Sequence, residues 1–567
     1  MDNNDRSVTL TGDLHYPEKT WSEETGKRDP PRVLLTSVFG PYAKDEGYGQ
    51  KHTFSMELYN NQITRAQGPY SLRMFHNSWG IRMIQANISA PSTVLDFPSL
   101  EAFEKELRSH NYDIVGITSI IMNVKKVRLL CDIIRKLSPN SKIVVGGHIA
   151  AIPDLGKIIE ADHIVKGDGI SWMRRYLGED DKAPIIHPPL LGTFGFRVMG
   201  VTLPETQRSP DATIVSSVGC PMGCKFCATS NFFGGKGKSV VFLKTGAEIY
   251  QAMCEAESSL KTGDFFVMDE NFLLNRKRVM ELLELMKANN KSWSLNVFAS
   301  ANAIRQYTMG ELVELGISML WIGLESPRSQ FEKLKSADTM KLVEELQSNG
   351  IKVIGSTIIG LEHHTPENVI EEIEYAVRHD SDFHQFMLYI PFFGTPLYAE
   401  LEKEGRLLKD MDHTEFPGLH AFSFKHATIS REESERLINW AFQHDFERNG
   451  PSFYRLLRTT FRGWMKHKNH PDLRVRKRIE RVATPLRTVA TAFFWAMERI
   501  YKDRDPAMGG QIRSFRLEVE KEFGLLPCLS ARLLGPVLVW TTRREEERLA
   551  RGITYEPRTF IERKNWL

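Results

Sequence analysis

Residues 218–230 read Val-Gly-Cys-Pro-Met-Gly-Cys-Lys-Phe-Cys-Ala-Thr-Ser and contain three of the six cysteines in this chain of 567 residues. Cys220, Cys224 and Cys227 therefore lie on one short segment with the spacing CxxxCxxC. A [4Fe–4S] cluster takes one cysteine thiolate per iron, so three thiolates leave one iron open to another ligand. Zinc sites prefer four ligands in paired CxxC elements, so the spacing favours a cluster over zinc or over purely structural thiols.

A repeating strand–helix pattern begins at this segment and continues to about residue 405. Helical stretches at 276–289 and 366–379 space their apolar residues with a helical period. Alternation of this kind predicts a parallel sheet with helices outside it, here a partial (β/α)6 barrel over residues 205–405. The strands are expected at 213–217, 265–268, 293–298, 318–322, 352–358 and 382–388.

The ends of these strands carry polar or glycine-rich sequences in a fixed order after the cysteines: MDENF at 268–272, WIGLES at 321–326, GSTIIGLE at 355–362 and YIPFFGTPL at 389–397. In this combination the chain resembles the radical SAM superfamily. The resemblance implies one [4Fe–4S] cluster, held by the three cysteines, whose fourth iron binds S-adenosyl-L-methionine (SAM). An electron from a donor such as flavodoxin or ferredoxin then cleaves SAM to a 5′-deoxyadenosyl radical.

The resemblance also implies which residues contact SAM and the cluster. Phe226 lies against the cluster, since it occupies the aromatic position of the cysteine motif. The remaining contacts are expected for the ammonium group, the ribose and the adenine in turn: Asp269 and Glu270, Glu325 and Ser326, and Gly360 and Glu362.

The segment before the cysteines has its own organisation. Residues 1–30 are polar and show no basic start followed by an apolar core, so they predict a flexible lead-in and no signal peptide. Residues 31–180 alternate strands with helices and predict a doubly wound, flavodoxin-like α/β domain. Its strands are expected at 32–38, 92–96, 113–119, 142–146 and 163–166, with helices at 100–109 and 123–137.

Small residues close the later strands of this domain, in the order DIVGITS, KIVVGGHIAAIPD and HIVKGDG. This ordered set resembles the cobalamin-binding domain that precedes the barrel in one large radical SAM group. The resemblance implies that cobalamin's nucleotide tail inserts beside the sheet. The expected contacts are Thr118, Ser119, Gly146, Gly147 and Asp168.

No DxHxxG motif follows the first strand, where SVFGPYAKDEGYG stands, so no histidine from that motif lies beneath the cobalt. His148 follows the paired glycines, and a loop histidine satisfied by hydrogen bonds is a commoner outcome than a metal ligand. A domain that keeps the fold but binds nothing is the alternative.

Residues 406–567 predict a basic, mainly helical C-terminal region. From residue 451 to the end the chain has 25 Lys and Arg against 13 Asp and Glu, interleaved with aromatic residues. This pattern suits a helical cap on the barrel, an anionic membrane surface or a nucleic acid. Among partners, the apolar content favours the membrane, through Trp464, Phe493, Phe494, Trp495 and Trp540. No apolar run is expected to be long enough to span a bilayer.

Together these features predict a cobalamin-dependent radical SAM enzyme that methylates an unactivated carbon of a hydrophobic or lipid-like small molecule. Two alternatives stay open: the same modules used for bond formation, cyclisation or ring rearrangement without methyl transfer, and a cobalamin-binding sensor with a silent barrel. Six cysteines without a disulfide framework suit a reducing compartment, so a cytoplasmic protein, peripheral on the inner face of the membrane, is expected.

Overall fold

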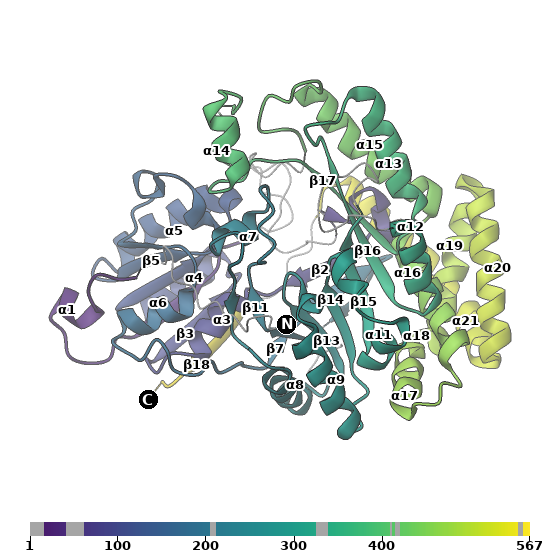
Figure 1. The fold of residues 1–567 in the computed structure, drawn as a ribbon, viewed down its shortest axis with the longest axis horizontal. Helices are drawn as coiled ribbons and strands as arrows, with labels where there is room; N and C mark the ends of the chain where they lie inside the picture. Colours follow the sequence, from purple (N-terminus) through teal and green to yellow (C-terminus); the bar gives the residue numbers. More distant parts are fainter. Residues whose placement is uncertain are drawn as a thin grey trace, which may run out of the picture.

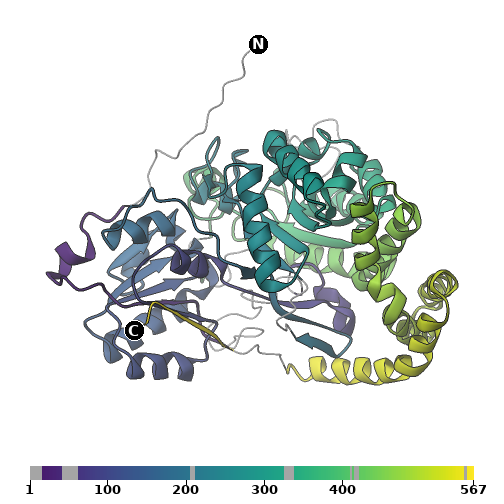
Figure 2. The same cartoon turned by 90° about the horizontal axis from the view of Figure 1, so that it is seen from below.

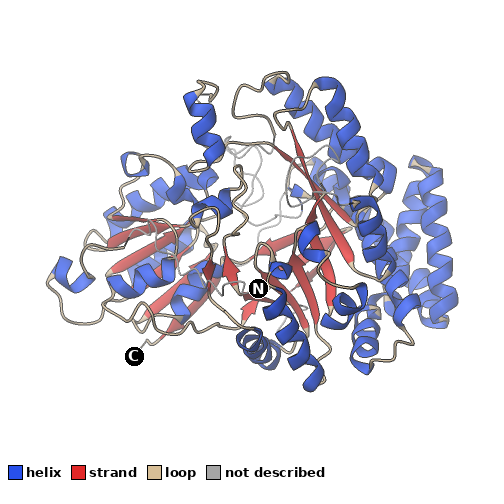
Figure 3. Cartoon of the chain, viewed as in Figure 1, coloured by secondary structure: helices blue, strands red, loops and turns tan. Residues whose placement is uncertain are grey.

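The computed structural model describes residues 16–40, 60, 62–204, 211–324, 338–408, 411–413, 420–553 and 559–566. Figure 1 shows three parts: an N-terminal α/β part at the left, a second α/β part in the centre and a stack of helices at the right. Figure 3 shows the strands of the first two parts as two separate sheets with helices around them.

The N-terminal sheet has six strands in the order β18-β3-β1-β4-β5-β6, of which the last five in this order run parallel. Without β18, the spatial order of the strands is 2-1-3-4-5, the flavodoxin-like order, so the predicted doubly wound domain is confirmed. The parallel strands are β1 (Val33–Thr36), β3 (Ser92–Asp96), β4 (Ile114–Thr118), β5 (Lys142–Gly146) and β6 (His163–Val165).

Helices cover both faces of this sheet because its strands are apolar on both sides. Leu34 packs in a core with the helices of one face, whereas Val33 and Leu35 pack in a core with the helices of the other. Strands buried on both faces are characteristic of parallel sheets. The first face carries α4 (Leu100–Ser109) and α5 (Val124–Leu137), and the second carries α3 (Trp79–Ala86) and α6 (Gly169–Tyr176); α1 (Trp21–Thr25) precedes β1.

The sixth strand comes from the other end of the chain. β18 (Phe560–Lys564) pairs antiparallel with β3, and Figure 2 shows it lying within the N-terminal part. Arg563 forms an ion pair with Glu106 at 2.8 Å, and the Trp566 indole donates to the Ser92 carbonyl at 3.1 Å. The sequence had placed this segment in a mainly helical region, so the strand is an addition that it did not predict.

The central sheet has seven strands in the order β17-β16-β15-β14-β13-β10-β7. Six of them run parallel in chain order, and β7 (Leu190–Leu191) adds antiparallel to β10. β17 and β7 lie at the two edges, so the barrel is partial, as predicted. The parallel strands are β10 (Ala212–Val215), β13 (Asp264–Met268), β14 (Ser294–Phe298), β15 (Ile317–Gly323), β16 (Lys352–Ile359) and β17 (Phe383–Leu388).

Helices follow these strands and bury one face of the sheet. The longer ones begin at capping residues such as Thr245, Asn275 and Thr365, whose side chains accept a hydrogen bond from the first turn. They are α8 (Gly246–Leu260), α9 (Arg276–Ala288), α10 (Ala301–Ile304), α11 (Met309–Leu315), α12 (Thr339–Ser348), α13 (Pro366–Arg378) and α14 (Pro396–Lys403).

Two small sheets and several short helices connect the large parts. One sheet joins β2 (Arg73–His76), β8 (Thr193–Val198) and β9 (Val201–Pro204), and the other joins β11 (Ser217–Val218) and β12 (Val240–Val241). The short helices are α7 (Ala228–Phe232), η2 (Arg65–Tyr70), η3 (Ile121–Asn123), η4 (His148–Ala151), η5 (Leu155–Lys157) and η6 (Phe272–Leu274).

The C-terminal region is helical and has its own aromatic core. Phe493 and Phe494 are buried in this core with Tyr454, Phe461 and Phe515. The first two therefore do not face a membrane, although the sequence offered them as membrane contacts. The helices are α15 (Arg431–Asn449), α16 (Ser452–His467), α17 (Leu473–Val482), α18 (Thr484–Thr488), α19 (Ala490–Arg504), α20 (Pro506–Phe523) and α21 (Leu525–Ala550).

Within the described ranges, α21 has the length and apolar composition of a membrane-crossing helix, with a mean hydropathy of 1.4 over its most apolar stretch. The sequence predicted no apolar run of this length, and that prediction was wrong. Of this stretch, 33% is buried against the rest of the protein. A single helix of this kind is weak evidence for a span, because its length and composition also occur in helices of protein cores.

Candidate functional site

The cysteine segment forms a loop between β11 and α7, held by its own backbone and by two polar side chains. The Cys227 amide donates to the Cys224 carbonyl at 3.0 Å. Ser230 Oγ donates to the Cys220 carbonyl at 2.6 Å, and Asn231 Nδ2 donates to the carbonyls of Cys224 and Cys227 at 3.0 and 2.8 Å. Three carbonyls of the loop are thereby fixed, so the backbone that carries the thiols has a defined shape.

Glycine is required where the loop turns most sharply. Gly223 has φ +64°, and a Cβ there would lie 2.4 Å from the Lys236 Cα. A larger residue would therefore both strain the backbone and collide with the segment that closes the loop.

The three thiols are near enough to one another for the charge on one to affect the pKa of another. Burial raises the pKa of Cys220 to about 11, and the neighbouring Cys227 and Cys224 add to the rise. Binding of iron removes the thiol protons. In the part of the chain that the structure describes, no three His, Cys, Asp or Glu side chains are grouped to hold a single metal ion. A cluster that assigns each thiolate to a different iron needs no such grouping, so the donor set fits it.

Asp269 and Glu270 follow β13 but have different surroundings. Asp269 is buried and forms an ion pair with Arg278 at 2.5 Å, and it accepts from the Asn271 amide at 3.1 Å. Glu270 Oε2 is buried without a hydrogen-bond partner among the described residues, and burial raises the pKa of this carboxyl to about 7. A buried carboxylate oxygen without a partner fits an incoming cation, so Glu270 suits an ammonium group and Asp269 holds the turn.

The loop after β16 is shaped by a histidine and a phenylalanine. His364 Nδ1 accepts from the amides of Gly360 and Leu361 at 2.9 and 3.3 Å. Burial lowers the pKa of His364 to about 3, so the ring is neutral and can accept. Gly360 has φ +85°, and a Cβ there would lie 2.1 Å from the Phe422 ring. The backbone of this loop is therefore fixed from outside.

The cysteine loop contacts the segment that follows β17 and the start of α14. Phe226 lies against Tyr389 with ring centroids 5.8 Å apart, and the Leu397 amide donates to the Lys225 carbonyl at 3.1 Å. Glu362 points elsewhere, because its half-exposed carboxylate meets Arg406 at 3.4 Å.

Glu325 and Ser326, the expected ribose contacts, lie outside the described residues.

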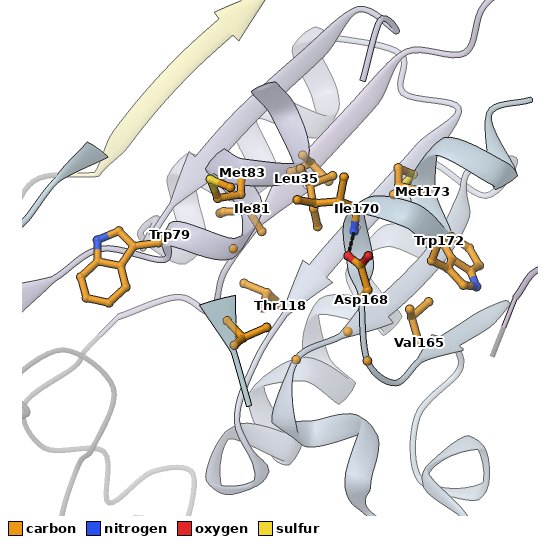
Figure 4. Close-up of a pocket in the computed structure, with 18 of the residues that line it drawn as sticks. Leu35, Trp79, Ile81, Met83, Thr118, Val165, Asp168, Ile170, Trp172 and Met173 are labelled. Carbon is orange, nitrogen blue, oxygen red and sulfur yellow. Dashed lines mark hydrogen bonds between the residues drawn. The ribbon is translucent and has the colours of Figure 1, made fainter. Parts of the chain in front are cut away.

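A cavity of about 290 Å³ opens at the carboxyl ends of the N-terminal strands. It runs between the sheet and the helices of one face, and Figure 4 shows side chains of α3 and α6 with Leu35 of β1 between them. Two glycines let the chain pack closely beside the cavity. A Cβ at Gly116 would lie 2.9 Å from Leu35, and a Cβ at Gly147, where φ is +83°, would lie 2.5 Å from the Ser119 carbonyl oxygen.

Four of the five predicted cobalamin contacts line this cavity: Thr118, Gly146, Gly147 and Asp168. Asp168 also caps α6, since its carboxylate accepts from the Ile170 amide at 2.9 Å (Figure 4). Ser119 is buried and does not line the cavity, but its carbonyl accepts from the Ile149 amide at 3.1 Å. It holds the loop after β5 in place.

The same cavity is lined from the barrel side by residues that follow the cysteines. Phe232 and Phe233 come from the end of α7, whose first turn is capped by the Cys227 thiol. His148 packs on Phe232 with ring centroids 4.7 Å apart, and burial lowers the pKa of His148 to about 4. One short helix thus joins the cysteine loop to the cavity.

Sequence reasoning missed both this aromatic pair and the α3 side of the cavity. In the sequence the adjacent phenylalanines are only two apolar residues. Their contact with His148 joins the two α/β parts of the chain, and local sequence does not predict it. On α3, the Trp79-Gly80 pair at the start of the helix was the available signal.

The apolar walls fit the tail of a large ligand such as cobalamin. Glycine is needed at position 147, because a Cβ there would collide with the Ser119 backbone where the loop after β5 packs against the end of β4.

Comparison with known families finds two domains in this order. Residues 72–176 match the B12 binding domain, and residues 214–376 match the radical SAM superfamily. The resemblances inferred from the cysteine loop and from the strand ends of the N-terminal domain are both confirmed. A radical SAM domain implies a [4Fe–4S] cluster and SAM, and a B12 binding domain implies cobalamin.

Methyltransferases are among the proteins that this chain resembles in sequence. Bacteriochlorophyllide d C-8(2)-methyltransferase of Chlorobaculum tepidum is 24% identical over 373 residues, which are 61% of this chain and 80% of the relative. Hopanoid C-2 methylase of Rhodopseudomonas palustris is 24% identical over 414 residues, which are 69% of this chain and 73% of the relative. Among solved structures, the radical SAM methyltransferase TsrM of Kitasatospora setae has a TM-score of 0.49 and 16% identity, over 80% of this chain and 99% of TsrM.

Proposed function

We propose that this chain, which belongs to the radical SAM enzymes that carry a B12-binding domain, transfers a methyl group from cobalamin to a carbon atom of a small molecule. The observation that carries the proposal is the continuity of the two sites. Cys227 caps the start of α7, and Phe232 and Phe233, at the other end of this helix, line the cavity of the B12-binding domain. The cysteine loop and one wall of the cavity therefore belong to one short segment, so SAM and cobalamin would be bound by neighbouring parts of the chain.

When bound, the cluster with SAM supplies hydrogen abstraction by a carbon radical, and cobalamin supplies the methyl group. The chain's own residues bind and orient. Cys220, Cys224 and Cys227 would hold three irons of the cluster and leave the fourth for SAM. Glu270 takes the ammonium group of SAM, and the neutral ring of His364 fixes the Gly360 backbone beside the adenine.

On the cobalamin side, the apolar cavity walls exclude water from the tail. Gly147 lets the loop after β5 pack against the end of β4, and the neutral His148 ring supports the aromatic pair of α7 without adding charge. A water-free site protects a reactive radical from side reactions.

The proposal also names a substrate class, an electron donor and a cellular location. We place the reaction on an unactivated carbon of a hydrophobic or lipid-like molecule, with flavodoxin or ferredoxin as donor. The protein is cytoplasmic and contacts the inner face of the membrane through its C-terminal region. The support is the net positive charge of residues 451–567, with 25 Lys and Arg against 13 Asp and Glu, together with the apolar helix α21.

Methyl-labelled SAM tests the reaction type. Anaerobically reconstituted protein, with cobalamin and a reductant, is incubated with a lipid extract of a strain that lacks the gene, and products are analysed by mass spectrometry. Label in a product that is absent from the deletion strain supports the proposal. Deoxyadenosine without label in any product supports rearrangement instead, and no deoxyadenosine at all supports the sensor.

A further inference from the structure

The exposed side of α21 carries a continuous row of large apolar side chains. Leu525 is 72% exposed, Leu533 70% and Trp540 56%. Single exposed apolar residues are ordinary, but a contiguous row on one helix marks an interaction surface. The row, called here the α21 apolar face, consists of Leu525, Leu526, Leu529, Leu533, Leu534, Val537 and Trp540.

The opposite side of α21 is packed against the protein. Gly535 lies so close to α19 that a Cβ there would be 2.5 Å from the Trp495 ring, and Leu538 and Thr542 are buried. Glu545, near the end of the helix, pairs with Arg197 of β8 at 2.5 Å. The helix is therefore fixed along the surface with its apolar face outward, and it is not free to span a bilayer in this fold. Figure 2 shows it at the edge of the molecule, away from the N-terminal sheet.

The charged residues of α21 indicate what kind of partner its apolar face contacts. From Leu525 to Arg544 the helix has no acidic residue, and its charged residues there are Arg532, Arg543 and Arg544, all exposed. The Arg544 guanidinium lies over the Trp540 ring, 4.7 Å from its centroid. Tryptophan and arginine beside an apolar row are the features of helices that lie in a membrane interface and attract anionic headgroups.

We propose that the α21 apolar face docks in the plane of an anionic lipid bilayer, with the three arginines at headgroup level. The inference rests on the proposed function in one respect: if the substrate is hydrophobic, the bilayer would be its source. It replaces the aromatic residues of α19 as the membrane contact, because Phe493 and Phe494 are buried.

Co-sedimentation of the full-length holoenzyme with vesicles tests the docking. The Leu529→Asp/Leu533→Asp variant should bind vesicles containing phosphatidylglycerol roughly a hundredfold more weakly than the wild type. The matched control is Ile186→Asp/Ile370→Asp, which changes two exposed apolar residues on other parts of the molecule and should bind as the wild type does. Equal binding by the α21 variant would overturn the proposal.

A second variant separates the charges from the apolar face. Arg532→Ala/Arg543→Ala/Arg544→Ala should weaken binding to anionic vesicles roughly a hundredfold at low salt, and the difference should shrink at high salt. If this variant bound like the wild type at low salt, the anionic bilayer would be the wrong partner.

Fluorescence gives a readout that does not depend on activity. Lipids brominated on their acyl chains should quench wild-type fluorescence more than that of Trp540→Phe, because Trp540 would lie at the acyl boundary. Equal quenching would contradict insertion. If wild-type protein were dimeric in solution and the Leu529→Asp/Leu533→Asp variant monomeric, without lipid binding by either, the face would belong to a second copy. Deoxyadenosine formation without vesicles reports the proposed function separately, and should be the same in all these variants.

Discussion

The two parallel sheets both place their loops at the carboxyl ends of strands, but they make room for ligands differently. In the N-terminal sheet glycines let the chain pack closely beside the cavity: a Cβ at Gly116 would press on Leu35, and a Cβ at Gly147 would press on the Ser119 backbone. In the barrel the polar side chains are present and are held by partners, as Asp269 is by Arg278 and the Gly360 loop is by His364. The first arrangement would suit a bulky, mostly apolar tail, whereas the second would suit a small polar ligand.

This difference implies that the two sites can be broken separately, although α7 connects them. A substitution at Gly147 should leave cluster assembly unchanged, and a substitution in the cysteine loop should leave cobalamin binding unchanged. Only changes to Phe232 or Phe233 touch both, because these residues line the cavity and end the helix that Cys227 begins.

The largest effect is expected from Cys224→Ser. Loss of one of three thiolates should abolish cluster assembly, since a serine hydroxyl does not replace a thiolate on iron at neutral pH. Reconstituted wild type should hold about four irons per chain, and the variant close to none, with no deoxyadenosine formed. Cobalamin binding, measured by absorbance after gel filtration, should remain.

Near eight irons in the wild type would instead indicate a second cluster. Full SAM cleavage by Cys224→Ser would refute the role of the loop.

The mirror experiment is Gly147→Val. The valine would be strained at φ +83° and would press its Cβ on the Ser119 carbonyl, so cobalamin affinity should fall by more than about a hundredfold. Iron content should stay at the wild-type value. Gly178→Val is the matched control, since Gly178 has φ +73° with nothing within 4 Å of its Cβ position. If both variants lost cobalamin affinity equally, the cause would be backbone strain and not the collision with Ser119.

Local sequence predicted the fold well because the strands are buried on both faces and read as short apolar runs. The predicted strand 142–146 coincides with β5, and the predicted helix 100–109 coincides with α4. The cysteine loop was also readable, since its ligands lie within eight residues of one another.

Contacts between residues far apart in the chain could not be predicted from the sequence. β18 pairs with a strand more than 460 residues earlier and has a mixed polar sequence, Phe-Ile-Glu-Arg-Lys, without alternation that would reveal it. The amphipathic pattern of α19 likewise gave no means of telling a protein core from a membrane, because both demand an apolar face. The partners of Asp269 and Glu270 required coordinates, since neighbouring carboxylates look equivalent in the sequence.

That last pair gives the third prediction. Glu270→Gln should weaken SAM binding by roughly thirtyfold, because a neutral amide replaces the carboxylate that faces the ammonium group. The measurement is equilibrium binding of SAM to cluster-loaded protein. Iron content should not change. Asp269→Asn should act differently, by releasing Arg278 and lowering the thermal stability of the domain.

A thirtyfold loss in Asp269→Asn with none in Glu270→Gln would exchange the two roles.

The smallest effect on either site is expected from Glu545→Gln. This variant tests whether the C-terminal region can lose stability without a change in iron content or cobalamin affinity. Burial works to raise the pKa of Glu545, but hydrogen bonds and charge from Arg548 and Arg197 lower it to about 2. The folded state therefore favours the ionised form. The resulting stability is present above pH 4.5, the ordinary value of the carboxyl, and is lost as pH falls from there toward 2.

The free energy of unfolding of Glu545→Gln in urea should be about 2 kcal/mol below that of the wild type at pH 7. The difference should be about 1 kcal/mol smaller at pH 4, because the unfolded wild type then takes up the proton that the folded state refuses. Iron content and cobalamin affinity at pH 7 should match the wild type, since the pair joins α21 to β8 and touches neither the cysteine loop nor the cavity. A difference in stability that did not shrink at low pH would mean that packing, and not charge, accounts for the loss. A drop in cobalamin affinity would mean that the C-terminal helices and the N-terminal sheet are coupled more tightly than the separation of their sites implies.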